Sequence, residues 1–356
     1  MKINNFAAGP SKIPKKILDE ITYDINDYNN LGYSILELSH RSDLFQDMVD
    51  QVKSKIFSIL NVPNNYEILL LQGGATFQNT FIPANKLSLK NNISFLISGT
   101  WSSKTFHDFE KYFNHDIPFQ NFDYKNFDSL LHKVHHNNDD YLYLTSNETI
   151  EGVQFRDFEI FEQKKLIIDM SSDICSYEFN WDNISYIFAG AQKNLGIPGV
   201  TVCIFKKDFF EKNNLTSYLD STNHLSKNST FNTPPTFSVY VMLKVLNWIN
   251  ESGGIKKIEE INKIKAKKLY DYLDDNLSVF SLNAPEGFRS FSNIVFNFND
   301  ESKTSTFLDL CIKNGFIGLN GHRSVGGIRV SNYNSIELPM IEDFISFLDK
   351  FVRSKQ

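Results

Sequence analysis

From Tyr66 onward the chain repeats one pattern: a short apolar run, a polar or glycine-rich turn, and a longer segment with helical spacing. The apolar runs are Glu67–Leu71, Ile93–Ser98, Tyr141–Thr145, Leu166–Asp169, Ile184–Ala189 and Val200–Phe205. Short runs that are rich in β-branched and aromatic residues and bounded by turn residues predict buried strands. Because these strands alternate with helices, we expect βαβ units, a mostly parallel central sheet and therefore an α/β fold.

The length of the chain predicts two domains, because 356 residues exceed the size at which one hydrophobic core stops growing. We expect a large domain over residues 15–255 and a smaller C-terminal α+β domain over residues 256–356. An extended N-terminal arm, residues 1–14, is expected to belong to the smaller domain. A charged helix from Ile255 to about Asn276 is expected to bridge the two. Its buried side is expected to carry Ile258, Ile261, Ile264 and Leu269.

Helical spacing and turn residues predict further elements. The first expected helix, Lys15–Tyr28, places Ile17, Leu18, Ile21 and Ile25 on one face. A second helix is expected over Asp43–Leu60, with Ser42 or Asp43 as its cap. Residues Leu215–Thr230 are expected to form a polar loop.

Composition excludes several classes of protein. A net charge of −6 and a pI near 5.8 argue against nucleic acid or an anionic membrane as the main partner. The start of the chain lacks the apolar segment of a secretory signal, and no apolar run approaches membrane-spanning length. Cys175, Cys203 and Cys311 are widely spaced and show no metal-binding pattern. We therefore expect a cytoplasmic protein in a reducing compartment, without a metal site.

Lys193 lies between two of the expected strands, in the loop of Gly190-Ala-Gln-Lys-Asn194. A lysine held at the ends of core strands risks losing its water, which favours the neutral amine needed for Schiff-base chemistry with a carbonyl. Asp169 closes a neighbouring strand, 24 positions earlier. An acid and a lysine at strand ends form the pattern expected for pyridoxal phosphate, in which the acid pairs with the ring nitrogen. The same residues also fit a solvated lysine and a strand-end turn former.

Two further groups lie after strand ends. Gly73-Gly74-Ala75-Thr76 follows a strand and opens a helix, and the free N–H groups of such a turn bind anions. Trp101 follows the next strand, where a flat indole can lie on a ligand ring. A tight turn and a core-filling tryptophan are the alternative interpretations.

An anionic substrate of this acidic chain must be met by local cations. The candidates are His40, Arg41, His322, Arg323 and Arg329. Arginine offers a planar fork for carboxylate or phosphate. For each of them taken singly, a surface ion pair is the alternative.

Several motifs, in order along nearly the whole chain, resemble those of the phosphoserine aminotransferases, which belong to the aspartate-aminotransferase-like class (fold type I) of pyridoxal-phosphate enzymes. The motifs are Asn4-Phe-Ala-Ala-Gly-Pro10, Ser39-His-Arg41, Asn147-Glu-Thr149, Gly190-Ala-Gln-Lys-Asn194, Phe231-Asn-Thr-Pro-Pro235 and Gly321-His-Arg323 with Arg329. A single motif of this kind occurs in many unrelated proteins, whereas six in the same order are specific for one family.

The resemblance implies a role for each candidate. It makes Lys193 the Schiff-base lysine and Asp169 the partner of the ring nitrogen, with Trp101 on the ring face and Thr149 at the ring hydroxyl. It places the cofactor phosphate at Ala75, Thr76 and Gln192, and at Asn232 and Thr233 of the neighbouring subunit. It assigns Arg329 to the substrate α-carboxylate, and His40, Arg41, His322 and Arg323 to the distal phosphate or carboxylate of the substrate.

The implied activity is amino transfer between glutamate and 3-phosphohydroxypyruvate, which gives phosphoserine and 2-oxoglutarate in serine biosynthesis. A pyridoxine-pathway step that forms 4-phosphohydroxy-threonine is also open. The implied assembly is a homodimer whose active sites are shared between two chains. The alternatives are another fold-type-I enzyme, such as an alanine–glyoxylate aminotransferase or a cysteine desulfurase, and a non-catalytic binding protein that keeps the fold.

Overall fold

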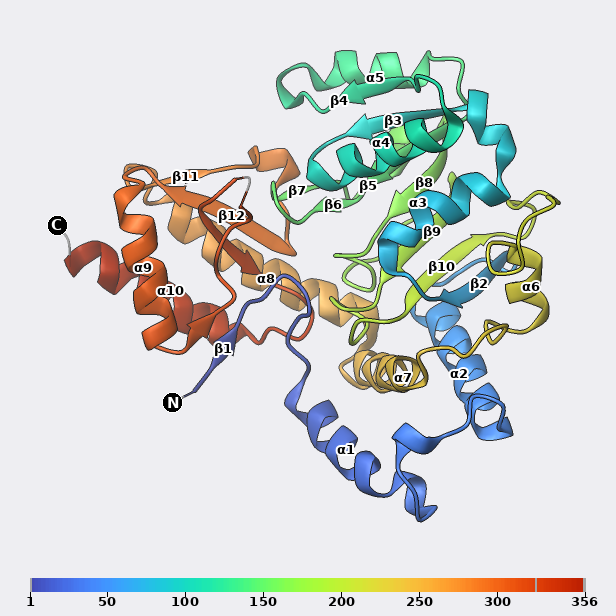
Figure 1. The fold of residues 1–356 in the computed structure, drawn as a ribbon. Coiled ribbons are helices and arrows are strands. Elements are labelled where there is room, and N and C mark those ends of the chain that lie inside the picture. The colour runs from blue at the N-terminus through green and yellow to red at the C-terminus, as the bar shows by residue number, and fades with distance from the viewer. Residues whose placement is uncertain (1, 324, 355–356) are drawn as a thin grey trace.

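A seven-stranded sheet forms the centre of the computed structural model, which describes residues 2–323 and 325–354 (Figure 1). In spatial order its strands are β2 (Tyr66–Leu71), β10 (Thr201–Lys206), β9 (Ile184–Gly190), β8 (Lys165–Asp169), β5 (Tyr141–Thr145), β3 (Ile93–Ile97) and β4 (Phe119–Asn121). β10 runs antiparallel to both neighbours, and the other adjacent pairs are parallel. The predicted mostly parallel sheet is confirmed; β4 was not predicted, because three half-exposed residues carry no apolar pattern.

Both faces of the sheet are covered by helices, so alternate residues of each strand enter different cores. On β2, Leu69 and Leu71 enter one core while Ile68 and Leu70 enter the other. The first core is shared with α3 (Gly74–Asn85) and α4 (Thr100–Phe113). The second core is shared with α1 (Lys15–Asn26), α2 (Asp43–Ile59), α5 (Phe127–His135) and α7 (Thr236–Glu251). Because both faces are buried, the strands read as continuous apolar runs.

Apart from these two cores of the central sheet, a third, separate core lies in the C-terminal part of the chain. It is built on an antiparallel sheet of β11 (Phe280–Leu282), β12 (Asn293–Phe298) and β14 (Ile328–Ser331), covered by α9 (Ser302–Lys313) and α10 (Leu338–Ser354). The arm joins this part through β1 (Asn4–Asn5), which pairs with β13 (Phe316–Ile317), and through the buried Phe6. This separation of cores supports the predicted division near residue 255, which stays a prediction.

Helix α8 (Gly254–Asp274) passes from one core to the other, as Figure 1 shows. Ile255 and Ile258 belong to the large core, and Leu269 and Leu273 belong to the C-terminal core. The predicted burial of Ile264 is wrong: this side chain is 41% exposed, and Lys265 is buried instead. The reason is geometric, because each step of three residues falls about 60° short of a full turn, so the spacing 258, 261, 264 drifts off the buried face.

Two other expectations on local structure are corrected. On α1, Leu18 and Ile25 are exposed, and Ile17, Ile21 and Asp24 form the buried face. The expected polar loop Leu215–Thr230 contains a short helix, α6 (Ser221–Ser226), which Asp220 caps. The predicted cap of α2 is confirmed, since the Ser42 side chain accepts a hydrogen bond from the Phe45 N–H.

The remaining short elements lie in connections. β6 (Asn147–Glu148) and β7 (Val153–Gln154) form a small antiparallel pair after β5. Short 3₁₀ turns cover Tyr28–Asn30, Ile35–Glu37, Leu87–Asn91, Tyr124–Asn126, Glu159–Phe161 and Glu286–Phe288. Within the described residues, none of the helices is both long enough and apolar enough to cross a membrane.

Candidate active site

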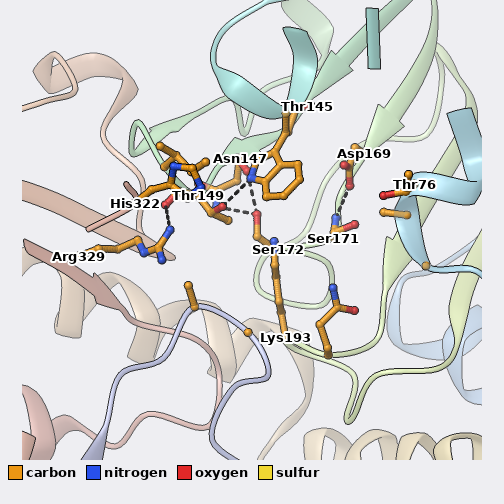
Figure 2. Close-up of a pocket in the computed structure, with 17 residues that line it drawn as sticks. Thr76, Thr145, Asn147, Thr149, Asp169, Ser171, Ser172, Lys193, His322 and Arg329 are labelled. Atoms are coloured by element: carbon orange, nitrogen blue, oxygen red, sulfur yellow. Dashed lines mark hydrogen bonds between the residues drawn. The ribbon is translucent and has the colours of Figure 1, made fainter. Parts of the chain in front are cut away.

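A cavity of about 430 Å³ opens where the carboxyl ends of β5 and β8 meet the loop between β9 and β10 (Figure 2). Asp169 and Thr76 lie on one side of it, His322 and Arg329 on the opposite side, and Lys193 between them. The N-terminal arm closes the floor with Ala8 and Gly9. The volume is that of a small-molecule site.

Lys193 and Asp169, which the sequence placed in a loop and at the end of a neighbouring strand, face this one cavity. Burial lowers the pKa of the Lys193 amine, and the charges of Asp169 and Asp173 oppose that shift. Burial also raises the pKa of the Asp169 carboxyl, against the hydrogen bond that Ser171 donates to it and the charge of Lys193. Burial therefore disfavours the charged form of both groups, and a cationic ring beside Asp169 would stabilise its carboxylate.

The Lys193 loop is held by the N-terminal arm and by a buried amide. The Ser11 N–H donates to the Gln192 carbonyl at 2.9 Å, and the Ser11 hydroxyl donates to the Lys193 carbonyl. A side chain at Gly9 would lie about 3.5 Å from the Lys193 Cγ. Asn194 donates to the carbonyls of Ser172 and Ile174. These contacts fix the lysine backbone while its amine stays in the cavity.

The first turn of α3 has the backbone geometry that an anion site requires. Gly73 adopts a left-handed conformation at φ 92°, which favours glycine, and no side chain caps the helix. Gly74, Ala75 and Thr76 line the cavity, so this helix start lies at its edge. Free N–H groups at a helix start bind phosphate.

Thr149 links the indole of Trp101 to Arg329. Its hydroxyl accepts a hydrogen bond from the Trp101 Nε1 at 2.9 Å, and its carbonyl accepts one from the Arg329 Nη1 at 3.2 Å. The Arg329 Nε is buried and has no partner among the described residues. Such a buried donor needs an acceptor, which an anion in the cavity would supply.

Not every predicted site residue lies at this cavity. His322 lines it, while Arg323 follows on the exposed end of the same segment. His40, Arg41, Asn232 and Thr233 do not line it. The expected single anion pocket of His40, Arg41, His322 and Arg323 is therefore not assembled within one chain.

Three of the displaced residues share a different location. The Arg41 Nη1 donates to the Thr230 carbonyl at 3.3 Å, which places it on the loop that carries Asn232 and Thr233. Gln72, directly before the first turn of α3, bonds to both: its Nε2 donates to the Thr233 carbonyl at 2.6 Å, and its Oε1 accepts from Asn232 at 3.1 Å. We call Arg41, Gln72, Asn232 and Thr233 the Gln72 cluster; His40 directly precedes Arg41 in the chain.

Polar residues to which sequence analysis gave no role also line the cavity. They are Thr145, Asn147, Ser171 and Ser172. Thr145 ends β5, and the other three follow the ends of β5 or β8 within a few residues, so their position at a strand end was the available signal. Among the described residues no group of histidine, cysteine, aspartate or glutamate side chains could hold a metal ion.

The family model of the class-V aminotransferases (Aminotransferase class-V) matches residues 3–337. The chain therefore belongs to the class-V aminotransferases. Within that class it belongs to the phosphoserine aminotransferase family: it is 39% identical to the phosphoserine aminotransferase of Lysinibacillus sphaericus over 99% of this chain and 98% of that one. The protein of Geobacillus kaustophilus is 38% identical, and the match covers 98% of both chains. The family predicted from the sequence is confirmed.

Solved structures agree with this assignment. The phosphoserine aminotransferase of Bacillus circulans subsp. alkalophilus superposes with a TM-score of 0.93 at 34% identity, over 100% of this chain and 99% of that one. A pyridoxal-phosphate-bound phosphoserine aminotransferase from Trichomonas vaginalis gives 0.88 at 30% identity, over 98% and 100%. An alanine–glyoxylate aminotransferase from Nostoc sp. gives 0.77 at 15% identity, over 99% and 96%, which shows a shared fold alone. The predicted fold type I is confirmed.

Proposed function

We propose that this chain is a pyridoxal-phosphate-dependent phosphoserine aminotransferase, which moves an amino group between glutamate and 3-phosphohydroxypyruvate and yields phosphoserine and 2-oxoglutarate. One observation carries the proposal: Lys193 and Asp169 face one cavity, with Arg329 on its opposite side. That arrangement provides an amine, an acid for a ring nitrogen, and a cation for a substrate carboxylate. The family of the chain supports the same activity.

The residues around the cavity fit pyridoxal phosphate. The uncapped first turn of α3 accommodates a phosphate at Ala75 and Thr76, and Gln192 lines the cavity as well. Asp169 would hold the ring nitrogen, Thr149 the ring hydroxyl, and Trp101 one face of the ring. When bound, the cofactor would supply an aldehyde carbon for the amines of Lys193 and of the substrate, and a ring that accepts electrons as the Cα proton leaves.

The side chains of this chain then bind the substrate and move its proton. Arg329 holds the α-carboxylate through its buried Nε, which orients the Cα–H bond toward Lys193. The amine of Lys193, whose pKa burial lowers, accepts the Cα proton as a general base and returns it as a general acid. The negative charge of Asp169 would hold the protonated ring nitrogen of the cofactor in place. His322, which lines the cavity on the side of Arg329, and the following residue Arg323 would bind the distal phosphate or carboxylate of the substrate.

We further propose that the active enzyme is a homodimer with shared sites. The Gln72 cluster brings Arg41, which follows His40 in the chain, next to the loop that the family motif assigns to the neighbouring cofactor phosphate. Leu31, Tyr33 and Leu36, in the segment before His40, are 48%, 37% and 56% exposed, and exposed apolar groups beside a site are commonly buried in an interface. In a dimer, His40 and Arg41 would complete the distal anion pocket of the partner, which one chain lacks.

The rival activities lack support. A cysteine desulfurase needs a reactive, accessible thiol, whereas Cys175, Cys203 and Cys311 are buried, and burial raises the pKa of each to about 12. Three free, buried cysteines also support the proposed cytoplasmic location.

A coupled assay tests the proposal. Purified protein loaded with pyridoxal phosphate is given phosphoserine, serine or alanine as the amino donor and 2-oxoglutarate as the acceptor, and its visible spectrum is recorded. We expect the spectrum of a bound Schiff base and a kcat/KM that is highest for phosphoserine. A colourless protein would support a non-catalytic role, and equal use of alanine would refute phosphate recognition. The same assay with 4-phosphohydroxy-threonine tests the pyridoxine-pathway substrate.

A further inference from the structure

The first turn of α4, which carries Trp101, is held by two carboxylates. Glu148, at the end of β6, accepts hydrogen bonds from the Trp101 N–H at 3.0 Å, the Ser102 N–H at 2.9 Å and the Ser102 hydroxyl at 2.6 Å. Glu151 accepts bonds from the Thr100 N–H at 2.9 Å and the Thr100 hydroxyl at 2.6 Å. The first three N–H groups of the helix therefore all end on glutamate oxygens.

This arrangement is costly compared with an ordinary cap. The Glu148 side chain is fully buried, and burial together with the charge of Glu151 raises its pKa to about 7. The second carboxylate oxygen of Glu151 is buried and has no partner among the described residues. Helix α2 is capped by a single serine, Ser42, without any buried charge. Capping alone does not explain why a fully buried acid, Glu148, and a partly buried one, Glu151, meet at α4.

The backbone at Gly99 is adapted to the two acids. A Cβ atom there would lie 2.4 Å from the Glu151 Oε2 and 2.7 Å from the Glu148 Cδ. A residue with a side chain would therefore push one or both acids away from the helix. A larger residue at this position would therefore displace these carboxylates, although its φ of 179° is ordinary extended backbone.

The two acids fix a residue that packing leaves loose. Trp101 is 37% exposed. Its backbone N–H is held by Glu148, and its ring Nε1–H is held by the hydroxyl of Thr149, the next residue of the same segment. Adjacent residues thus hold both ends of the tryptophan, which sets the orientation of the indole relative to the strand ends around the cavity.

We propose that Glu148 is a positioning residue that fixes the indole of Trp101 over the cavity by presenting two acceptor oxygens to two consecutive helix N–H groups. The inference rests on the proposed function for its consequence, the binding of the cofactor ring against that indole. Glu151 needs one oxygen only, because Thr100 bonds to a single carboxylate atom. The two acids therefore differ in what an amide can replace.

The matched variants are Glu148→Gln and Glu151→Gln. A glutamine at 148 offers one acceptor and one NH₂ group, so whichever way the amide turns, one backbone N–H faces a donor. A glutamine at 151 keeps the acceptor for Thr100 and exchanges only the unpartnered oxygen. At a pH of about 8.5, above the raised pKa of Glu148, both variants remove one negative charge, so a difference between them reports hydrogen-bond geometry.

The measurement is acrylamide quenching of tryptophan fluorescence in the cofactor-free dimer or monomer, whichever the protein forms. The contribution of Trp101 is the difference between each protein and its Trp101→Phe counterpart. We expect the quenching constant of Trp101 to rise at least about two-fold in Glu148→Gln and to stay at the wild-type value in Glu151→Gln. Pyridoxal phosphate should bind Glu148→Gln about ten-fold more weakly, which is one lost hydrogen bond in a buried site.

Two outcomes overturn the inference: unchanged Trp101 quenching in Glu148→Gln, or an equal rise in both variants, which would indicate a charge effect. If Glu148→Gln does not fold, Trp101 quenching is measured in the wild-type protein as a function of pH.

Protonation of Glu148 removes one acceptor, so Trp101 quenching should rise as the pH falls through about 7, with a lower midpoint in Glu151→Gln. The charged and titratable groups that interact with Glu148 are Glu151, Tyr143 and Lys193. A flat titration refutes the inference. Quenching is read without cofactor, so its failure is distinct from a failure of the proposed transamination.

Discussion

A buried lysine at the junction of the two cores makes a testable prediction about stability. Lys265 on α8 has no exposed side-chain surface, and its ammonium donates to the carbonyls of Tyr333 and Ile336 at 3.0 and 2.8 Å. No carboxylate among the described residues forms an ion pair with it. Burial, and secondarily the charge of Lys12, lowers its pKa from 10.5 to about 7. The prediction is that Lys265→Met abolishes one pH-dependent part of the free energy of unfolding.

The sign follows from which state binds the proton. Between its folded and unfolded pKa values, Lys265 is protonated in the unfolded chain and largely neutral in the folded one. The free energy of unfolding therefore rises with pH, by up to about 1.4 kcal/mol per pH unit for one proton. From about pH 7.5 to 9.5 this amounts to roughly 2–3 kcal/mol, and the full shift corresponds to a cost on the order of 5 kcal/mol for the charged form.

The assay compares urea unfolding of the cofactor-loaded protein with that of its variants at several pH values and a fixed protein concentration. Other lysines titrate equally in both proteins, so they cancel in the difference between wild type and Lys265→Met. That difference should change by roughly 2–3 kcal/mol in favour of the wild type from about pH 7.5 to 9.5. The control is Lys267→Met, which removes an exposed lysine of the same helix.

Parallel stability curves for wild type and Lys265→Met would refute the reasoning. They would mean that the Lys265 proton is bound equally in the folded and unfolded chain, as it is for a solvated lysine. A loss of stability that is constant with pH would assign Lys265 a role in its two carbonyl hydrogen bonds alone.

Lys193→Ala should lower the transamination rate by on the order of 10³-fold or more without altering circular dichroism, because the general base is lost; a rate near wild type would overturn its role. Arg323→Ala should reduce kcat/KM about ten-fold more for phosphoserine than for alanine, and equal reductions would contradict phosphate recognition by this residue. Asn232→Ala chains mixed with Lys193→Ala chains should recover up to about a quarter of the wild-type activity, since a mixed dimer has one intact site. Activity in the mixture no higher than in the separate variants would exclude shared sites.

The apolar pattern of the sequence was sufficient to predict the strands and where the site lies. The strands that end at Asp169 and precede Lys193 are continuous apolar runs, because both faces of the sheet are covered. Their order along the chain, with helices between them, implies parallel pairing and so brings their ends to one edge. The cofactor assignment needed in addition the identity of residues that follow those ends, which is local information.

Other features depended on contacts between distant segments. Whether Ile264 or Lys265 is buried on α8 was decided by which helix face meets the Tyr333–Ile336 segment, about 70 residues away in the chain. Helical spacing alone permits either choice for a short stretch. The contacts of Glu148 and Glu151 with α4 could not be predicted from the sequence either. Carboxylates in a turn are expected to be solvated unless the tertiary structure places a helix against them.

The sequence by itself determined the α/β sheet, the strand ends at which the site forms, and the lysine–acid pair. Hydrophobic periodicity and the alternation of strands and helices along the chain can be read from the sequence directly. Only the tertiary structure decided that His40, Arg41, Asn232 and Thr233 stand apart from the cavity that holds Lys193. Their positions follow from long-range hydrogen bonds to Thr230 and Gln72, whose partners no local pattern identifies. The physical reason is that a site built from several segments is fixed by how those segments pack, and packing is a property of the whole chain.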